Sequence, residues 1–197
     1  MRGVFVLIAS AFLAGCAADP IWAPDEAVTK ARYVHPGPKY ITLYTMKNVG
    51  SDNGVHSSLL INGSQRVMWD PSGAFSHPQL PERNDLIFGM SPSGLDVYVD
   101  YHSRASYYTV AQTLEVSPEV AESLLRRAMS HGAVMNAFCT NSTSTLLQET
   151  PGFENIRTSF VPDNLMEQFA KLPGVVTEEF RDDDESKEAA LERAQDL

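Results

Sequence analysis

Apolar positions follow two different periods along this 197-residue chain, and the period changes once, near residue 117. Before that point, β-branched and aromatic residues alternate with polar ones in short runs bounded by Gly, Asn, Asp and Pro, which is typical of half-buried strands. A long proline-containing loop is predicted over 74–93. We predict strands over residues 40–46, 55–61, 65–69, 95–101 and 107–116. This part of the chain therefore predicts a small antiparallel meander.

After residue 117 the apolar positions recur at helical spacing. Ser117 is a favourable N-cap, Pro118 suits the first helical position, and Gly132 ends the apolar stripe. Two more helices are predicted, one from residue 136 or 137 to about 149, and one over 164–172 with Asp163 as its cap. Strands followed by helices predict an α+β fold, in which an antiparallel sheet packs against helices.

The N-terminus has the pattern of a bacterial lipoprotein signal. A basic start and an apolar run over 4–13 precede Cys16 in the sequence Leu-Ala-Gly-Cys. The run is too short to span a bilayer but suits a signal peptide. We predict a signal peptide over 1–15 and lipidation of Cys16; an ordinary cleavage site beside a chance cysteine is the alternative. Several acyl chains on one residue give stable anchoring, since each buried CH₂ contributes about 0.8 kcal/mol.

The flanking segments complete the predicted organisation. Ala17 follows the cysteine where an aspartate would resemble the inner-membrane retention signal of enteric lipoproteins, so the outer membrane is favoured, with the protein facing the periplasm. Prolines and weak periodicity predict a tether over 16–38. Much of the net charge of -10 lies near the C-terminus, which predicts a solvated, partly helical acidic tail over 181–197. Residues 39–180 are then one domain.

Composition and motifs exclude several classes of function. The chain is acidic and has no cluster of basic residues, which argues against a nucleic-acid partner. Its histidines and cysteines have no zinc-type spacing, and the sequence has neither a phosphate loop nor a dinucleotide fingerprint, so no metal or cofactor is predicted. The absence of a Gly-x-Ser-x-Gly elbow argues against a serine hydrolase.

Cys139 is the one thiol left once Cys16 is lipidated, and an unpaired thiol in an exported protein needs an explanation. If Asn136 caps the second helix, Cys139 occupies the third helical position. There the free amides and the helix dipole favour a thiolate, and the same amides can bind the oxyanion of a tetrahedral intermediate. The alternative is a buried, inert cysteine.

His56 is the candidate base and Asp70 the candidate residue that orients it. With a three-residue turn over 62–64, Ile61 faces Gln65 and His56 faces Asp70 on the same side of the sheet, with Cβ atoms about 5 Å apart. A two-residue turn breaks this register. A satisfied core histidine and an aspartate that caps a turn are the alternatives.

The order of these residues resembles that of the circularly permuted NlpC-type papain-like proteins, which include YiiX-like and lecithin–retinol acyltransferase-like enzymes. The similarity covers residues 40–147: a histidine on an early strand, a polar residue on the next strand and a cysteine that opens a later helix. In ordinary papain-like chains the cysteine comes before the histidine. Two positions depart from the permuted pattern, because Phe138-Cys139-Thr140 replaces an Asn-Cys-Glu-type motif and Asp70 stands where many relatives have a histidine.

The resemblance implies a circularly permuted papain-like fold in which Cys139 is the nucleophile, His56 the general base and then acid, and Asp70 the orienting residue. It implies acyl transfer from an amide or ester to water or another acceptor. In the periplasm, peptidoglycan stem peptides or lipids are the available substrates, and the loop over 74–93 is a candidate wall of the substrate groove. A non-catalytic envelope-binding lipoprotein with the same fold is the alternative, and a redox-sensing thiol is a weaker third hypothesis.

Overall fold

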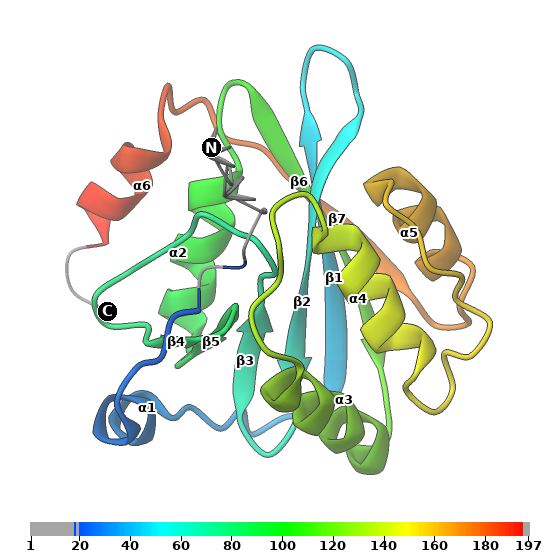
Figure 1. Cartoon of the computed structure of the whole chain (residues 1–197). Helices are drawn as coiled ribbons and strands as arrows, with labels where there is room; N and C mark the ends of the chain where they lie inside the picture. The colour runs from blue at the N-terminus through cyan, green and yellow to red at the C-terminus, as the bar shows by residue number, and fades with distance from the viewer. Residues whose placement is uncertain (1–17, 19, 195–197) are drawn as a thin grey trace, which may run out of the picture.

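The computed structural model describes residue 18 and residues 20–194 (Figure 1). Within them the helices are α1 (Asp25–Ala31), α2 (Pro92–His102), α3 (Pro118–His131), α4 (Cys139–Gln148), α5 (Pro162–Phe169) and α6 (Lys187–Arg193). The strands are β1 (Tyr40–Asn48), β2 (Gly54–Asn62), β3 (Arg66–Trp69), β4 (Glu82–Arg83), β5 (Leu86–Phe88), β6 (Tyr107–Glu115) and β7 (Val176–Phe180). All strand pairs are antiparallel, in the order β4-β5-β3-β2-β1-β6-β7. The predicted α+β class, with an antiparallel sheet against helices, is confirmed.

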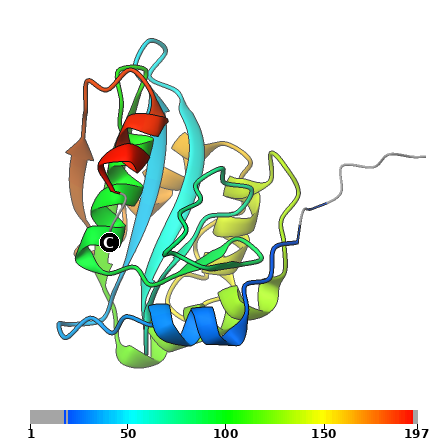
Figure 2. The ribbon, with the colours of Figure 1, turned by 90° about the vertical axis from the view of Figure 1, so that its left-hand side faces the viewer.

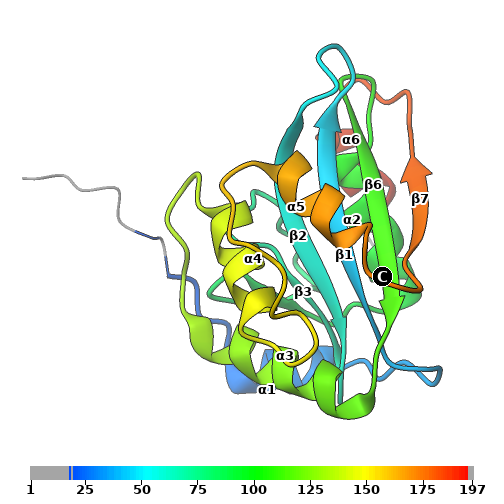
Figure 3. The same cartoon turned by 90° about the vertical axis from the view of Figure 1, so that its right-hand side faces the viewer.

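The sheet lies between two layers of helices, with α3, α4 and α5 on one face and α2 and α6 on the other (Figures 2 and 3). Because successive side chains of a strand point to opposite faces, each central strand contributes to two cores. Leu43 and Leu59 belong to the core under α3, α4 and α5. Met46 and Leu60 belong to the core under α2 and α6. The first layer carries Cys139, and the second layer faces His56, so the two layers meet at the candidate site.

The predicted strand over 95–101 is wrong, because this segment lies in α2. The side chain of Ser91 accepts a hydrogen bond from the backbone N–H of Gly94, and Pro92 follows at the first helical position, so the chain has a complete helix start. The buried positions Gly94, Val97, Tyr98 and Tyr101 recur at helical spacing. The apolar residues over 95–101 are compatible with the period of a strand and with that of a helix. The N-cap at Ser91 favours the helix.

The other predicted strands, over 40–46, 55–61, 65–69 and 107–116, are confirmed within two residues as β1, β2, β3 and β6. Three short or peripheral strands were not predicted. β4 and β5 lie within the predicted loop over 74–93, and β7 follows α5. These strands extend the sheet at its two ends, outside the part that carries His56 and Asp70.

The helix that starts with Ser117 as its cap is confirmed: the Ser117 side chain accepts a hydrogen bond from the N–H of Val120, and Gly132 ends the helix with φ 85°. The predicted starts of the next two helices are wrong. α4 begins at Cys139, because Ala137 has a left-handed φ of 68° that interrupts helical geometry. α5 begins at Pro162 after Val161, and the carboxylate of Asp163 accepts a hydrogen bond from the backbone N–H of Gly54 instead of capping the helix.

Both predicted flanking segments contain structure that contacts the domain. In the predicted tether, α1 contributes Val28 to the core under α3, and the backbone oxygen of Ala23 accepts a hydrogen bond from Arg83 at 2.8 Å. In the predicted tail, α6 packs on α2 and buries Ala190. The predicted signal peptide and Cys16 lie outside the described residues. Within the described residues, no helix combines the length and apolar character needed to cross a bilayer.

Candidate active site

The register of the β2–β3 hairpin brings His56 and Asp70 together in a way the sequence predicted only in part. Leu59 pairs with Trp69 and Asn62 with Arg66, so the turn has three residues but begins at Gly63, one residue later than predicted. The predicted direct pairing of His56 with Asp70 is therefore wrong: continuing the ladder puts Ser58 opposite Asp70, and His56 lies diagonally from it. Side-chain parity is unchanged by this shift, and His56 Nε2 lies 2.6 Å from Asp70 Oδ1.

Cys139 approaches His56 past an open edge of the sheet. His56 shares a face with its cross-strand neighbour Met46, which is the face covered by α2, whereas α4 packs on the opposite face. Because β3 pairs with β2 only from Leu59 onward, the first residues of β2 have no strand beside them on that side. The first turn of α4 fills this place, and Thr140 Oγ1 lies 3.1 Å from Ser57 Oγ. At this edge the Cys139 thiol and the His56 imidazole lie close enough for each to shift the pKa of the other.

The three side chains set one another's charge states. Burial raises the pKa of the Cys139 thiol, but the hydrogen bond and charge of His56, with smaller contributions from the N–H of Ser57 and the hydroxyl of Thr140, lower it to about 7. Burial lowers the pKa of His56, but the charge and hydrogen bond of Asp70, and then those of Cys139, raise it to about 10. At near-neutral pH this arrangement favours a thiolate beside an imidazolium. Since Nε2 contacts Asp70, Nδ1 is the ring nitrogen left for the sulfur.

Asp70 is held in place from several directions. Its side chain is 2% exposed. Burial raises the pKa of its carboxyl group, but the charge and hydrogen bond of His56, with His102 and the Tyr98 hydroxyl, hold that pKa below its usual value. Gly73 makes room for the carboxylate, because a Cβ at this position would lie 2.1 Å from Asp70 Oδ2. The carboxylate is thus a fixed, buried negative charge behind the His56 ring.

The start of α4 supplies donors for a developing oxyanion. In the first turn of a helix the backbone N–H groups have no intrahelical acceptor, and they point toward the end of the helix where Cys139 lies. The preceding turn is fixed by a hydrogen bond from the N–H of Phe138 to the oxygen of Met135 at 3.2 Å. The left-handed Ala137 stands within this turn, which is the kind of local strain that clusters at functional sites. Because α4 begins at Cys139, this residue occupies the first helical position and not the predicted third position.

His102, which the sequence favoured as the end of the predicted strand over 95–101, lies beside His56 at this site. Its ring stacks on that of His56 at a centroid distance of 6.3 Å and an interplanar angle of 13°. The ring nitrogen Nδ1 lies 2.8 Å from the backbone oxygen of Tyr98. Burial, with the nearby charge of His56, lowers the pKa of His102 to about 4 even though Asp70 opposes this shift, so His102 is neutral at pH 7. The neutral His102 ring limits the movement of the His56 imidazole. Because it carries no positive charge, it does not compete with His56 for the Asp70 carboxylate.

The signal that could have identified His102 and Tyr98 is the helix start at Ser91-Pro92. A helix beginning there puts Tyr98 and His102 one turn apart on the same face. The Tyr98 hydroxyl donates a hydrogen bond to Ser58 Oγ at 2.7 Å, which links this face to β2.

A cavity of about 280 Å³ lies on the α2 side of His56. Its walls come from β1 and β2, the turn that follows Asp70, the C-terminal end of α2, the start of β6 and the start of α6. Of the predicted loop over 74–93, only Ala74 lines it. The loop over 74–93 is therefore not the main wall of this cavity. Other segments, which the sequence did not associate with the site, form most of the wall.

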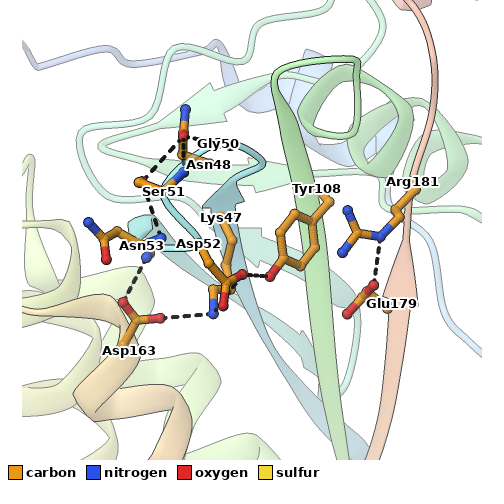
Figure 4. Close-up of polar contacts among 11 residues, drawn as sticks. Lys47, Asn48, Gly50, Ser51, Asp52, Asn53, Tyr108, Asp163, Glu179 and Arg181 are labelled. Carbon is orange, nitrogen blue, oxygen red and sulfur yellow. Dashed lines mark hydrogen bonds and ion pairs between the residues drawn. The ribbon is translucent and has the colours of Figure 1, made fainter.

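A second polar cluster, which we call the hairpin-tip cluster, surrounds Lys47 on the other side of β1 (Figure 4). Lys47 Nζ lies 3.5 Å from Asp52 Oδ1 and 3.4 Å from Asp163 Oδ1. The Tyr108 hydroxyl donates a hydrogen bond to Asp52. Through Asp163, which also binds the backbone N–H of Gly54, this cluster ties the β1–β2 hairpin to α5. It carries no nucleophile.

Asp100, Asp182 and Asp184 place carboxylate oxygens within 4.8 Å of one another, close enough to hold a metal ion. Arg193 already contacts two of them: its guanidinium lies 2.7 Å from Asp100 Oδ2 and also bonds to Asp184. The arginine thus supplies the positive charge that such a cluster needs, and it ties α6 to α2.

Comparison of the chain with protein-family models, with curated proteins and with solved structures finds no match.

Proposed function

We propose that this protein is a thiol-dependent hydrolase or acyltransferase that acts on an amide or ester of the bacterial cell envelope. The observation that carries the proposal is the arrangement of Cys139, His56 and Asp70, three residues from distant parts of the chain, with the pKa of the thiol lowered to about 7. A nucleophile, a base in contact with it and an acid that orients the base are what covalent acyl transfer requires. Structural cysteines have no need of a lowered pKa.

The chemistry follows from these contacts. The Cys139 thiolate attacks the substrate carbonyl carbon, and the first-turn amides of α4 stabilise the oxyanion that forms. The tetrahedral intermediate collapses, the bond to the leaving nitrogen or oxygen breaks, and the His56 imidazolium gives that atom its proton. His56 then takes a proton from water or another acceptor, which attacks the thioester and releases Cys139 as a thiolate. Asp70 keeps the imidazole oriented and stabilises its charged form.

We further propose a circularly permuted, NlpC-type papain-like fold for the domain. The order of the elements supports this: the histidine lies on β2, its acidic partner follows β3, and the cysteine opens the later helix α4. The proposed place of action is the periplasmic side of the envelope, with the chain anchored through a lipidated Cys16 and the outer membrane favoured. The basis for this is the N-terminal sequence. Peptidoglycan peptides and lipids are the proposed substrate classes.

The test is incubation of the full-length protein with muropeptides and with phospholipids, followed by mass spectrometry of the substrates and of the protein. We expect loss of an acyl group from one substrate class and a matching acyl adduct on Cys139. The Cys139→Ser variant is the control, because it removes the nucleophile and keeps a small polar side chain. Turnover that persists in Cys139→Ser would overturn the proposal.

A second measurement needs no substrate. A cysteine-directed alkylating probe should label Cys139 quickly at pH 7, more slowly in His56→Ala, and at the wild-type rate in His131→Ala, where the exposed histidine at the end of α3 is removed instead. The Cys139→Ser variant gives the background from any other thiol. Equal labelling of the wild type and His56→Ala would favour the alternative of a non-catalytic lipoprotein with an inert cysteine.

A further inference from the structure

The cavity beside His56 is positively charged in an otherwise acidic protein. Arg104 and Lys187 both line it, and within the described part of the chain no aspartate or glutamate does. The whole chain has a net charge of -10. Two cations gathered in one hollow repel each other, and removing them from water has a cost that an anionic partner offsets. The charge of this wall is therefore opposite in sign to the net charge of the chain.

The two cations are held in place by aromatic rings and not by acids. The Arg104 guanidinium lies 4.5 Å from the centroid of the Tyr107 ring, and its Nη1 donates to the backbone oxygen of Tyr101 at 2.9 Å. Lys187 Nζ lies 5.4 Å from the centroid of the Tyr101 ring. Among the described residues, neither cation forms an ion pair with a carboxylate.

Glu188 is a negative charge that interacts with both cations from outside the cavity wall. Lys187 and Arg104 both act electrostatically on its carboxyl group, but Glu188 is exposed and does not line the cavity. Its field is screened by solvent. The remaining donors of Arg104 and the ammonium of Lys187 are thus available to a ligand in the cavity.

The position of the cavity indicates which part of a substrate it would hold. It is lined by His56 but by no residue of α4, so it adjoins the imidazole and not the helix that carries the nucleophile. In acyl transfer the group that departs must lie beside the residue that protonates it, whereas the acyl group stays on the sulfur. A ligand in this cavity would therefore occupy the place of the leaving group.

We propose that this cavity is the leaving-group subsite of the enzyme and that it selects leaving groups carrying a carboxylate or phosphate, which Arg104 and Lys187 bind. The proposal rests on the proposed function for its role in the reaction, but not for the binding itself. When the acyl bond breaks, the leaving nitrogen or oxygen takes the proton from His56, and its anionic substituent stays between the two cations. An amino acid with a free carboxylate and an alcohol with a phosphate both have this chemistry.

Lys187 gives the C-terminal helix a part in this subsite. α6 is attached to α2 through Arg193 and through buried Ala190, and Ala194 accepts a hydrogen bond from His77 at 2.7 Å. The start of this helix thereby keeps Lys187 in the wall of the cavity. The segment predicted as an acidic tail would supply one of the two groups that read the charge of the substrate.

The test is direct binding to the full-length Cys139→Ser protein, in which no reaction can follow. Glycerol phosphate and N-acetylalanine are the anionic probes, with glycerol and N-acetylalanine amide as their neutral counterparts. Binding is read by calorimetry and by NMR of labelled histidine rings, since His56 and His102 both line the cavity. We expect saturable binding of at least one anion, weaker at high salt, a shift of the His56 resonance, and no response to the neutral probes.

The double variant Arg104→Gln/Lys187→Gln should bind that anion at least about tenfold more weakly, because charge-assisted hydrogen bonds are lost. The matched control is Arg126→Gln/Lys171→Gln, which removes the same charge from exposed positions on α3 and just after α5. Arg104→Lys should retain part of the affinity. Binding of neither anion, equal binding of a neutral counterpart, or equal weakening in both double variants would overturn the proposal.

A kinetic measurement separates the two proposals. A matched pair of acyl substrates, one with a free carboxylate on its leaving group and one with that carboxylate methylated, is compared in the wild type and both double variants. We expect kcat/KM to fall in Arg104→Gln/Lys187→Gln for the anionic substrate only. Turnover of both substrates without this selectivity contradicts the subsite alone. Anion binding in a protein whose thiol is inert contradicts the leaving-group role and the proposed function together.

Discussion

Two polar clusters lie on opposite faces of the same hairpin, and only one of them is suited to chemistry. In the hairpin-tip cluster, Lys47 lies between Asp52 and Asp163 (Figure 4). In the cluster of Cys139, His56 and Asp70, which we call the thiol cluster, the imidazole likewise lies between two groups that favour its charged form. Both clusters thus place a cation between anions at the end of β1 and the start of β2.

The two clusters differ in burial and in what remains open around them. Asp52 is 73% exposed, so the contacts of Lys47 compete with water and contribute little free energy. Asp70 is 2% exposed, and a cavity of about 280 Å³ adjoins its partner His56. A cluster of charged groups is suited to catalysis when the groups are buried, one of them is a nucleophile, and a cavity for the substrate adjoins the cluster. Charge clustering alone predicts none of this.

The largest effect expected within this comparison is on turnover in Asp70→Asn. An amide in place of the carboxylate keeps the shape but removes the charge that holds the His56 imidazolium, so we expect kcat/KM to fall by about 10³-fold. Asp163→Asn, the same change in the hairpin-tip cluster, should change kcat/KM by less than about threefold. The measurement is steady-state kinetics with the substrate found by mass spectrometry. Similar losses in both variants would remove the distinction between the clusters.

His56→Gln should change the thiol itself. Without the imidazolium, the pKa of Cys139 should rise from about 7 toward the ordinary 9.0, so labelling at pH 7 should slow by up to about 100-fold. Lys47→Met removes the cation of the hairpin-tip cluster and should leave the labelling rate unchanged. The pH dependence of alkylation, followed by mass spectrometry, gives the midpoint in each variant. A midpoint that stays near 7 in His56→Gln would mean that the helix start alone lowers this pKa.

The pH dependence of turnover should also follow the thiol cluster. The thiolate is lost as the pH falls through about 7, and the imidazolium is lost as the pH rises through about 10. We expect a bell-shaped kcat/KM with limbs near these values, which belong to the coupled pair, and a loss of about tenfold for each pH unit on the acid side. An acid limb near pH 9 would indicate an ordinary thiol. Lys47→Met should not move either limb.

Gly73→Ala should damage the thiol cluster without removing any of its reacting atoms. A Cβ at residue 73 would lie 2.1 Å from Asp70 Oδ2, so the carboxylate must move away from His56. We expect about a tenfold loss of kcat/KM, since a misplaced orienting group misplaces the base. Gly50→Ala is the matched control, because its Cβ would meet only Asn48 Oδ1 at 3.4 Å in the hairpin loop. Equal kinetics in the two variants would show that Asp70 tolerates displacement.

The smallest effect belongs to the hairpin-tip cluster. Asp163→Ala removes a partner of Lys47 and the acceptor of the Gly54 N–H, and we expect the free energy of unfolding to fall by about 1 kcal/mol because the site is partly exposed. Chemical denaturation measures this, with the labelling rate of Cys139 followed in parallel. A large change in labelling without loss of stability would give the hairpin-tip cluster a role in positioning His56 that its contacts do not indicate.

Local patterns carried most of the prediction of the fold. The Ser117 cap and Gly132 fixed the ends of α3, and alternation identified the central strands, because these signals depend on near neighbours. Alternation failed over 95–101, where the apolar residues are compatible with a strand and with a helix and only the cap at Ser91 distinguishes the two. β7 carries little signal of burial, since all its residues are exposed, and it was missed for that reason.

The sequence by itself determined the residue types, the order in which the chain supplies them, and the shared parity that puts His56 and Asp70 on one face. That parity survives a shift of the turn by one residue because side chains alternate with a period of two. Only the tertiary structure decided that the first turn of α4 lies at the open edge of β2 and that His102 stacks on His56. It also decided that Lys187, from the far end of the chain, lines the cavity. Contacts between distant segments depend on how two helical layers pack on one sheet, and no local pattern encodes that packing.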